Sequence, residues 1–106
     1  MPQLLFDMDQ HIVEPQDFWT SRATGKYKDL VPQVVDSPAG GEAWSFDGGA
    51  WIRPCGLESA AGRAPTDVHF KNTYASMQPG CYDPQKRLNA MDIDGVDKGL
   101  MFPSVA

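Results

Sequence analysis

The sequence predicts an α/β fold in which two parallel strands are joined through a helix, with a β-hairpin inserted between them. Three observations lead to this prediction. Two apolar segments each end in polar residues or proline, one well-delimited helix precedes the second segment, and an aromatic hairpin pattern occupies the middle. With 106 residues the chain is long enough for one small domain, so we expect a single unit over residues 1–106.

The first strand is expected over residues 3–13, QLLFDMDQHIV, which begin apolar and end polar. A parallel strand buried on both faces is nearly continuously apolar, and the carboxyl ends of such strands face the ligand. Glu14 and Pro15 close the strand. Pro15 suits the first turn of a short helix that ends near Arg22. Residues 23–41 are rich in Gly, Pro and Ser and predict a loop, which at most contains a short strand at positions 34 and 35.

A hairpin is expected over residues 42–53, EAWSFDGGAWIR. Trp44 and Phe46 alternate with small or polar residues, and Trp51 lies on the returning strand. The Asp-Gly-Gly sequence between them supplies left-handed turn geometry. Because a lone hairpin is marginally stable in water, these aromatic side chains must pack on the rest of the fold or on a partner chain.

The clearest helix begins at Asp83-Pro84 and ends at Gly95. Asp83 can cap the first turn, Pro84 suits its first position, and glycine favours the left-handed conformation that ends a helix. Residues 96–104, VDKGLMFPS, predict a second buried strand that closes at Pro103. Strands joined through a helix run parallel with a right-handed crossover. Two such strands do not make a stable sheet, so the chain looks like the opening of a larger fold.

Composition and charge exclude several classes of function. The net charge of −5 and the lack of a basic run argue against binding to nucleic acid or to an anionic membrane. We find no signal peptide and no apolar window of membrane-spanning length. Cys55 and Cys81 do not have the spacing of a zinc site, so we expect reduced, structural thiols in a cytoplasmic protein.

Acids and a histidine gather at the end of the first strand. Strict alternation would place Asp7, Asp9 and His11 on one face. A divalent metal accepts a carboxylate oxygen and a neutral imidazole nitrogen, so Asp9 and His11 would supply two ligands of a larger set. Asp7 would orient these ligands or hold the backbone. A polar strand end exposed to water is the alternative, and from spacing alone it is the more common one.

Three further groups contain residue types found in functional sites. Glu14 is a weak candidate for a general acid or base, with interaction with a helix dipole as the alternative. Asp67 and His69 form a second Asp-x-His, which we expect in a loop. The acidic residues 92–97 do not fit a calcium loop, because glycine comes at the fourth position and no closing glutamate follows. We expect them to form a helix end and a solvated turn.

Two segments resemble one family. FDMDQHIVEPQDFW is similar to the opening motif of the amidohydrolase-related metal-dependent hydrolases (amidohydrolase 2), in the branch with aminocarboxymuconate-semialdehyde and resorcylate decarboxylases. PGCYDPQKRLNAMDIDGVDKGLMFPS resembles the family's helix and second strand. Together the matches cover residues 4–22 and 79–104. The resemblance implies the N-terminal fragment of a (β/α)₈ TIM barrel, with its first two parallel strands and an inserted hairpin.

The resemblance also implies site residues and chemistry. Asp9 and His11 match the first two metal ligands, although many members have histidine at the position of Asp9. Zinc is the expected metal and manganese the alternative. Glu14 matches a common position without an assigned role, and residues 102–104 match the strand mouth where substrate contacts are expected. The implied activity is hydrolysis of a small carboxylate, amide or ester substrate, with metal-dependent decarboxylation as the alternative.

The resemblance places the remaining ligands, histidines from middle strands and a late aspartate, outside residues 1–106. The chain has only two histidines. The residues present therefore imply that this piece alone is inactive or nearly so. A rival from another class is a non-catalytic fragment that associates through exposed strand edges. We expect a small molecule as substrate and a homo-oligomer or other self-association.

Overall fold

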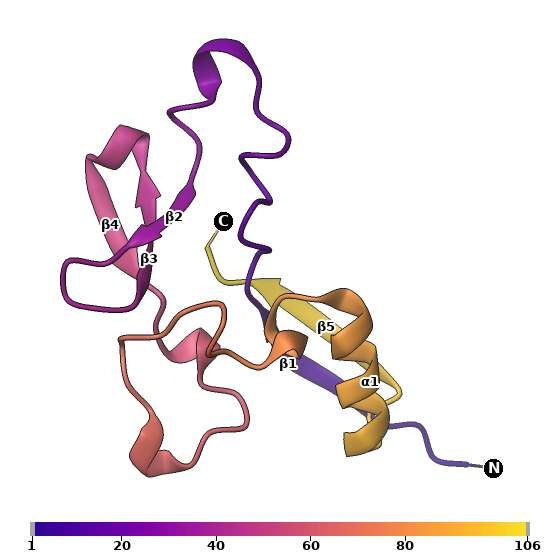
Figure 1. Cartoon of the computed structure of the whole chain (residues 1–106). Helices are drawn as coiled ribbons and strands as arrows, with labels where there is room; N and C mark the ends of the chain where they lie inside the picture. The colour runs from indigo at the N-terminus through magenta and orange to yellow at the C-terminus, as the bar shows by residue number, and fades with distance from the viewer. Residues whose placement is uncertain (1, 106) are drawn as a thin grey trace.

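The computed structural model describes residues 2–105, which form a mixed α/β structure with two separate sheets (Figure 1). One sheet is a parallel pair, β1 and β5, and the other is antiparallel, in the order β2-β3-β4. The strands are β1 (Phe6–Ile12), β2 (Gln33–Asp36), β3 (Glu42–Phe46), β4 (Trp51–Pro54) and β5 (Lys98–Pro103). The helices are α1 (Pro84–Asp94) and the 3₁₀ turns η1 (Gly25–Tyr27), η2 (Asp47–Gly49), η3 (Leu57–Ser59), η4 (Pro65–Asp67) and η5 (Pro79–Cys81).

The predicted parallel pair is confirmed, and its register contains an irregularity. Asp7 lies opposite Gly99, whereas Gln10 lies opposite Met101. Two residues of β1 therefore face a single residue of β5, which is the arrangement of a β-bulge. A bulge interrupts the alternation of side chains, so residues before and after it no longer follow a period of two.

Two side-chain contacts show which residues of β1 lie on the same face before and after the bulge. Lys98 Nζ lies 5.5 Å from the centre of the Phe6 ring. Beyond the bulge, the rings of His11 and Phe102 are 5.9 Å apart. Paired residues point to the same side of a sheet, and positions 98 and 102 of β5 share a face. Phe6 and His11, five positions apart in β1, therefore lie on one face.

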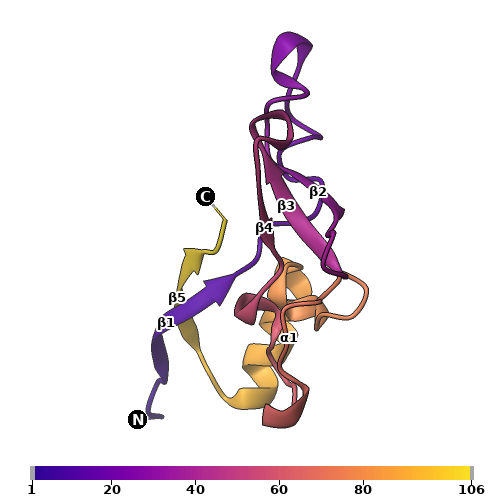
Figure 2. The same ribbon diagram turned by 90° about the vertical axis from the view of Figure 1, so that its left-hand side faces the viewer.

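The predicted helix is confirmed with its two caps. The side chain of Asp83 accepts a hydrogen bond from the Lys86 amide at 3.0 Å, and Gly95 ends the helix at φ 74°. Met91 is buried, whereas Leu88 on α1 is half exposed. The helix lies beside the β1–β5 pair, on the same side as the antiparallel sheet (Figure 2).

The predicted hairpin is confirmed as β3 and β4. Its turn has positive φ at Asp47 (50°), Gly48 (63°) and Gly49 (94°), so it uses the left-handed geometry that the sequence indicates. Next to the turn, the rings of Phe46 and Trp51 stack with centroids 3.9 Å apart. The optional short strand in the preceding loop is also present, as β2, which pairs with β3.

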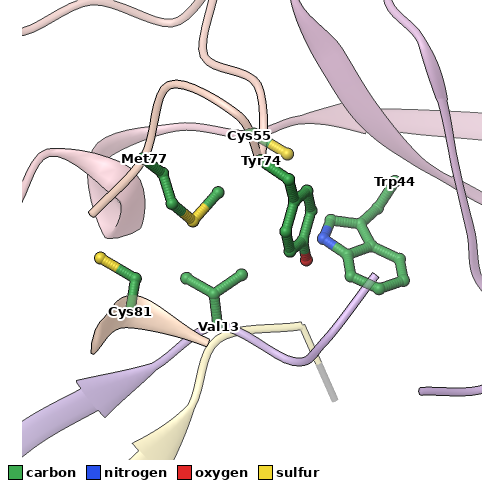
Figure 3. Close-up of a cluster of buried hydrophobic side chains, with 6 residues drawn as sticks. All are labelled: Val13, Trp44, Cys55, Tyr74, Met77 and Cys81. Atoms are coloured by element: carbon green, nitrogen blue, oxygen red, sulfur yellow. The ribbon is translucent and has the colours of Figure 1, made fainter. Parts of the chain in front are cut away.

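A small core joins the two sheets. Figure 3 shows its six buried side chains, which come from segments far apart in the sequence. Trp44 is fully buried and meets Tyr74 edge to face, with ring centroids 6.3 Å apart. The Val13 amide donates to the Cys81 carbonyl at 2.8 Å. The hairpin thus packs on the rest of the fold, which is one of the two alternatives expected from the sequence. The six residues are Val13, Trp44, Cys55, Tyr74, Met77 and Cys81.

The short helix predicted after Pro15 is wrong. Residues 16–22 form consecutive turns, with Phe18 N donating to Pro15 O at 2.9 Å. Arg22 holds these turns, because its guanidinium lies 4.5 Å from the centre of the Phe18 ring and donates to the Phe18 carbonyl at 2.7 Å. A segment of this length forms too few helical hydrogen bonds to offset the cost of nucleation.

The prediction of a buried second strand is also wrong. On β5, Leu100 is 50% exposed and Phe102 is 43% exposed. The apolar lead-in to β1 is similarly open, and Phe6 is 53% exposed. Within residues 2–105, the antiparallel sheet and α1 lie to one side of the parallel pair and leave its other face bare (Figure 2). The apolar side chains of β5 therefore lie on a face of the sheet that none of these residues covers.

Candidate functional site at the end of the first strand

Asp9 and His11 come together at the carboxyl end of β1. The Oδ1 atom of Asp9 lies 3.1 Å from Nε2 of His11, and the imidazole packs beside the Phe102 ring. Both side chains are open to solvent, with 84% of Asp9 and 58% of His11 exposed. The pair therefore offers an oxygen and a nitrogen donor at one point of the surface.

Asp7 does not share the face of this pair, so the prediction of three polar side chains on one face is wrong. The bulge between Asp7 and Gln10 changes the alternation, and Asp7 lies with Gly99 opposite it. Its Oδ1 atom accepts a hydrogen bond from the Asp9 amide at 3.1 Å. Asp7 thus holds the backbone of the bulge, which is one of the two roles the sequence suggested.

Glu14 is buried and anchors the ends of both parallel strands. Its two carboxylate oxygens lie 3.1 and 3.2 Å from the Val105 amide, which donates to them. The Glu14 carbonyl accepts from the Tyr74 hydroxyl at 2.5 Å. The segment after Glu14 forms turns, so the alternative of a carboxylate at a helix dipole is wrong. A role of Glu14 in proton transfer stays a prediction.

Two arginines that the sequence analysis did not single out hold this region from neighbouring elements. Arg53 of β4 donates to the Ser104 carbonyl at 2.6 Å. Arg87 of α1 donates through Nη2 to the His11 carbonyl at 2.5 Å and through Nε to the Gly80 carbonyl at 2.7 Å. The contacts to Ser104 and His11 join residues distant in the sequence, and no local pattern in the sequence signals them.

A cavity of about 780 Å³ lies beside the pair. It is bounded by the end of β1, the exit of β5, the η3 region and α1. Of the three residues expected at the mouth of the second strand, Pro103 and Ser104 line this cavity, while Phe102 packs against His11. Its polar lining includes Asp7, Asp9, Gln10, His11, Arg53 and Arg87.

The other acidic and histidine groups have local roles. His69 lies in a loop, as expected, where Nδ1 accepts from the Lys71 amide at 3.1 Å. The predicted helix end and turn at residues 92–97 are confirmed, because α1 ends at Asp94. Just beyond it, Asp97 accepts from the Leu5 amide at 2.8 Å.

Both cysteines are buried and free, which agrees with structural thiols. Burial raises the pKa of Cys55 to about 11, with a smaller contribution from the nearby charge of Glu58. Burial also raises the pKa of Cys81. Thiols with such pKa values stay protonated at neutral pH and are poor nucleophiles.

Asp9 and His11 are the pair of expected metal ligands that the structure brings into contact. In the described part of the chain, no group of three or more His, Cys, Asp and Glu residues is placed to hold a metal. A carboxylate and an imidazole are suitable donors for zinc or manganese, so the pair fits part of a ligand set.

The helices within residues 2–105 are too short or too polar to cross a membrane.

Comparison with known proteins gave no match to a protein-family model or to a curated sequence.

Proposed function

We propose that the chain is the N-terminal part of a metal-dependent hydrolase related to the amidohydrolases, in which Asp9 and His11 supply the first two metal ligands. The single observation that carries this proposal is the 3.1 Å contact between Asp9 Oδ1 and His11 Nε2 at the carboxyl end of a parallel strand. In α/β barrels the catalytic groups lie at that end of the strands. In the same proposal, β1 and β5 are the first two strands of a (β/α)₈ barrel.

The chain's own residues hold the backbone of this pair in place. Asp7 fixes the amide of Asp9, and Arg87 fixes the carbonyl of His11. Both contacts bind main-chain atoms and leave the carboxylate and the imidazole exposed to a ligand. Restricting the backbone of two ligands reduces the entropy that they lose on binding an ion.

A divalent ion bound here would act as a Lewis acid that activates water or polarises a substrate carboxylate. Hydrolysis of a small carboxylate, amide or ester substrate is our first assignment, and decarboxylation within the same family is the alternative. Because two ligands are fewer than a zinc site requires, residues 1–106 alone should bind metal weakly and show little or no turnover.

Zinc titration of the whole chain by isothermal calorimetry tests the ligand assignment. We expect His11→Ala to raise the zinc Kd at least about tenfold, because the imidazole is a direct ligand. His69→Ala is the matched control, since His69 also belongs to an Asp-x-His sequence but lies in a loop. Equal effects of the two substitutions would reject the assignment.

A second candidate function, self-association without catalysis, is favoured by the exposed face of the parallel sheet. Phe6, Leu100 and Phe102 are each between 43% and 53% exposed. Unpaired edges of a short sheet are also templates for pairing with another chain. Sedimentation velocity should give an assembly that Leu100→Lys weakens. Ile93→Lys, which replaces an apolar residue of α1 that is 86% exposed, should leave the assembly unchanged.

A further inference from the structure

The bare face of the parallel pair carries apolar side chains along its length. Lys98, Leu100 and Phe102 occupy alternate positions of β5 and share this face with Phe6 of β1. Phe6, Leu100 and Phe102 are each about half exposed, because the antiparallel sheet and α1 lie on the other side of the pair (Figure 2). Burying such side chains against a second apolar surface is favourable, so this face suits a partner of the same character.

The two ends of this face carry opposite charges. Lys98 is exposed at the start of β5, and no ion pair among the described residues involves it. Asp9, whose side chain is 84% exposed, lies at the other end, where it contacts His11 opposite Phe102. Positions 98 and 102 lie about 13 Å apart along the strand. The face therefore has a cation at one end, a carboxylate at the other and Leu100 midway along β5.

These charges select one way of packing two copies of the face together. A two-fold axis perpendicular to the strands, passing through the interface at Leu100, places the start of β5 in one copy over its end in the other. Asp9 of the second copy then lies about 4.8 Å to the side of Lys98, one strand spacing away and within reach of the four-carbon lysine stem. By symmetry this ion pair forms twice.

The other symmetric arrangement is disfavoured by the same charges. A two-fold axis parallel to the strands would bring the two Lys98 side chains to one end of the interface and the two Asp9 side chains to the other. Like charges brought together across an interface oppose that arrangement. The antiparallel arrangement is therefore the one in which the charges of the two copies are complementary.

We propose that the bare face packs against the same face of a second copy of this chain, with the strands antiparallel and Lys98 of each copy paired with Asp9 of the other. This inference rests on the second candidate function, self-association, and specifies its partner and orientation. A metal ion bound to Asp9 would compete with Lys98, so the dimer is measured in metal-free buffer with a chelator.

A charge swap tests the proposal, with the dimer Kd of the whole chain measured by sedimentation equilibrium. Lys98→Glu and Asp9→Lys should each raise this Kd roughly tenfold, because each places like charges together at both ends of the interface. The double variant Lys98→Glu/Asp9→Lys restores opposite charges in exchanged positions and should return the Kd to within about threefold of the original value. Asp9→Lys also lowers the negative charge of the chain, so general repulsion between copies would predict tighter assembly instead.

Lys86→Glu is the matched control, because it makes the same change of charge at an exposed lysine of α1, away from the bare face. It should change the dimer Kd by less than about threefold. Lys98 and Asp9 are both exposed, so their variants should keep the fold, which circular dichroism verifies.

A double variant that dimerises as weakly as the single variants would overturn the proposal, and so would tighter dimerisation of Asp9→Lys. If Leu100→Lys weakens the assembly while the charge swap restores nothing, self-association holds and the antiparallel packing is wrong. A chain that stays monomeric at every concentration measured rejects both self-association and this packing.

Discussion

Gln10 lies so close to Gly99 on the neighbouring strand that a Cβ atom added to Gly99 would come within 2.5 Å of Gln10 Cδ. The glycine therefore makes room for a buried amide side chain just after the bulge of β1. This contact ties the position of Gln10 in the cavity to the sequence of β5, and it makes the bulge testable through stability.

Gly99→Ala should lower the free energy of unfolding by about 1–3 kcal/mol, the usual cost of overpacking a filled site. The measurement is urea unfolding followed by circular dichroism. The control is the same substitution in a Gln10→Ala background, where the shorter side chain leaves space for the new methyl group. A coupling energy near zero between the two substitutions would show that the contact does not exist.

Tyr74→Phe should destabilise the fold by about 1 kcal/mol, because it removes the hydrogen bond from the hydroxyl to the Glu14 carbonyl. Tyr27→Phe serves as control, since Tyr27 is 57% exposed and should change stability by less than about 0.5 kcal/mol. Chemical denaturation of both variants measures the difference. Equal effects of the two substitutions would mean that the hydrogen bond of the Tyr74 hydroxyl does not contribute to stability.

Glu14→Ala should cost about 1–3 kcal/mol, because it leaves the Val105 amide without its acceptor. Glu14→Gln keeps a side-chain carbonyl at the same place and should cost less. Thermal and urea unfolding of the two variants provide the comparison. Equal losses for glutamine and alanine would mean that Glu14 acts through its charge and not as an acceptor.

Stability should fall as the pH rises from about 9 toward 11, because burial raises the pKa of Cys55 from its ordinary 9.0 to about 11. Over this interval the unfolded chain loses the thiol proton while the folded chain keeps it. The unfolded state therefore binds fewer protons, and the free energy of unfolding decreases with pH. Cys55→Ala should flatten this dependence in urea unfolding at pH 8, 9, 10 and 11. An unchanged slope would contradict the shift.

The elements that the sequence predicted correctly have local signals. The sequence Asp47-Gly48-Gly49 predicts the turn of the hairpin, and Asp83 and Gly95 predict the two ends of the helix. The bulge that separates Asp7 from His11 has no such signal, since it arises from the register between two strands distant in the sequence.

Within the candidate site, the sequence was sufficient to predict that Asp9 and His11 would be neighbours, because a period of two places them on one face. It did not predict how Glu14 and Arg53 hold the peptide between Ser104 and Val105 from opposite ends. That contact depends on how the hairpin packs against the parallel strands. Long-range hydrogen bonds of this kind have no periodicity to reveal them.

Manganese titration of the ¹⁵N-labelled chain, followed by paramagnetic broadening in NMR spectra, shows whether Asp9 and His11 bind a common divalent ion. We expect the resonances of Asp9 and His11 to broaden first, and His11→Ala to abolish this selectivity. Equal broadening at His69, or broadening spread evenly over the acidic surface, would mean that the pair is not the metal site.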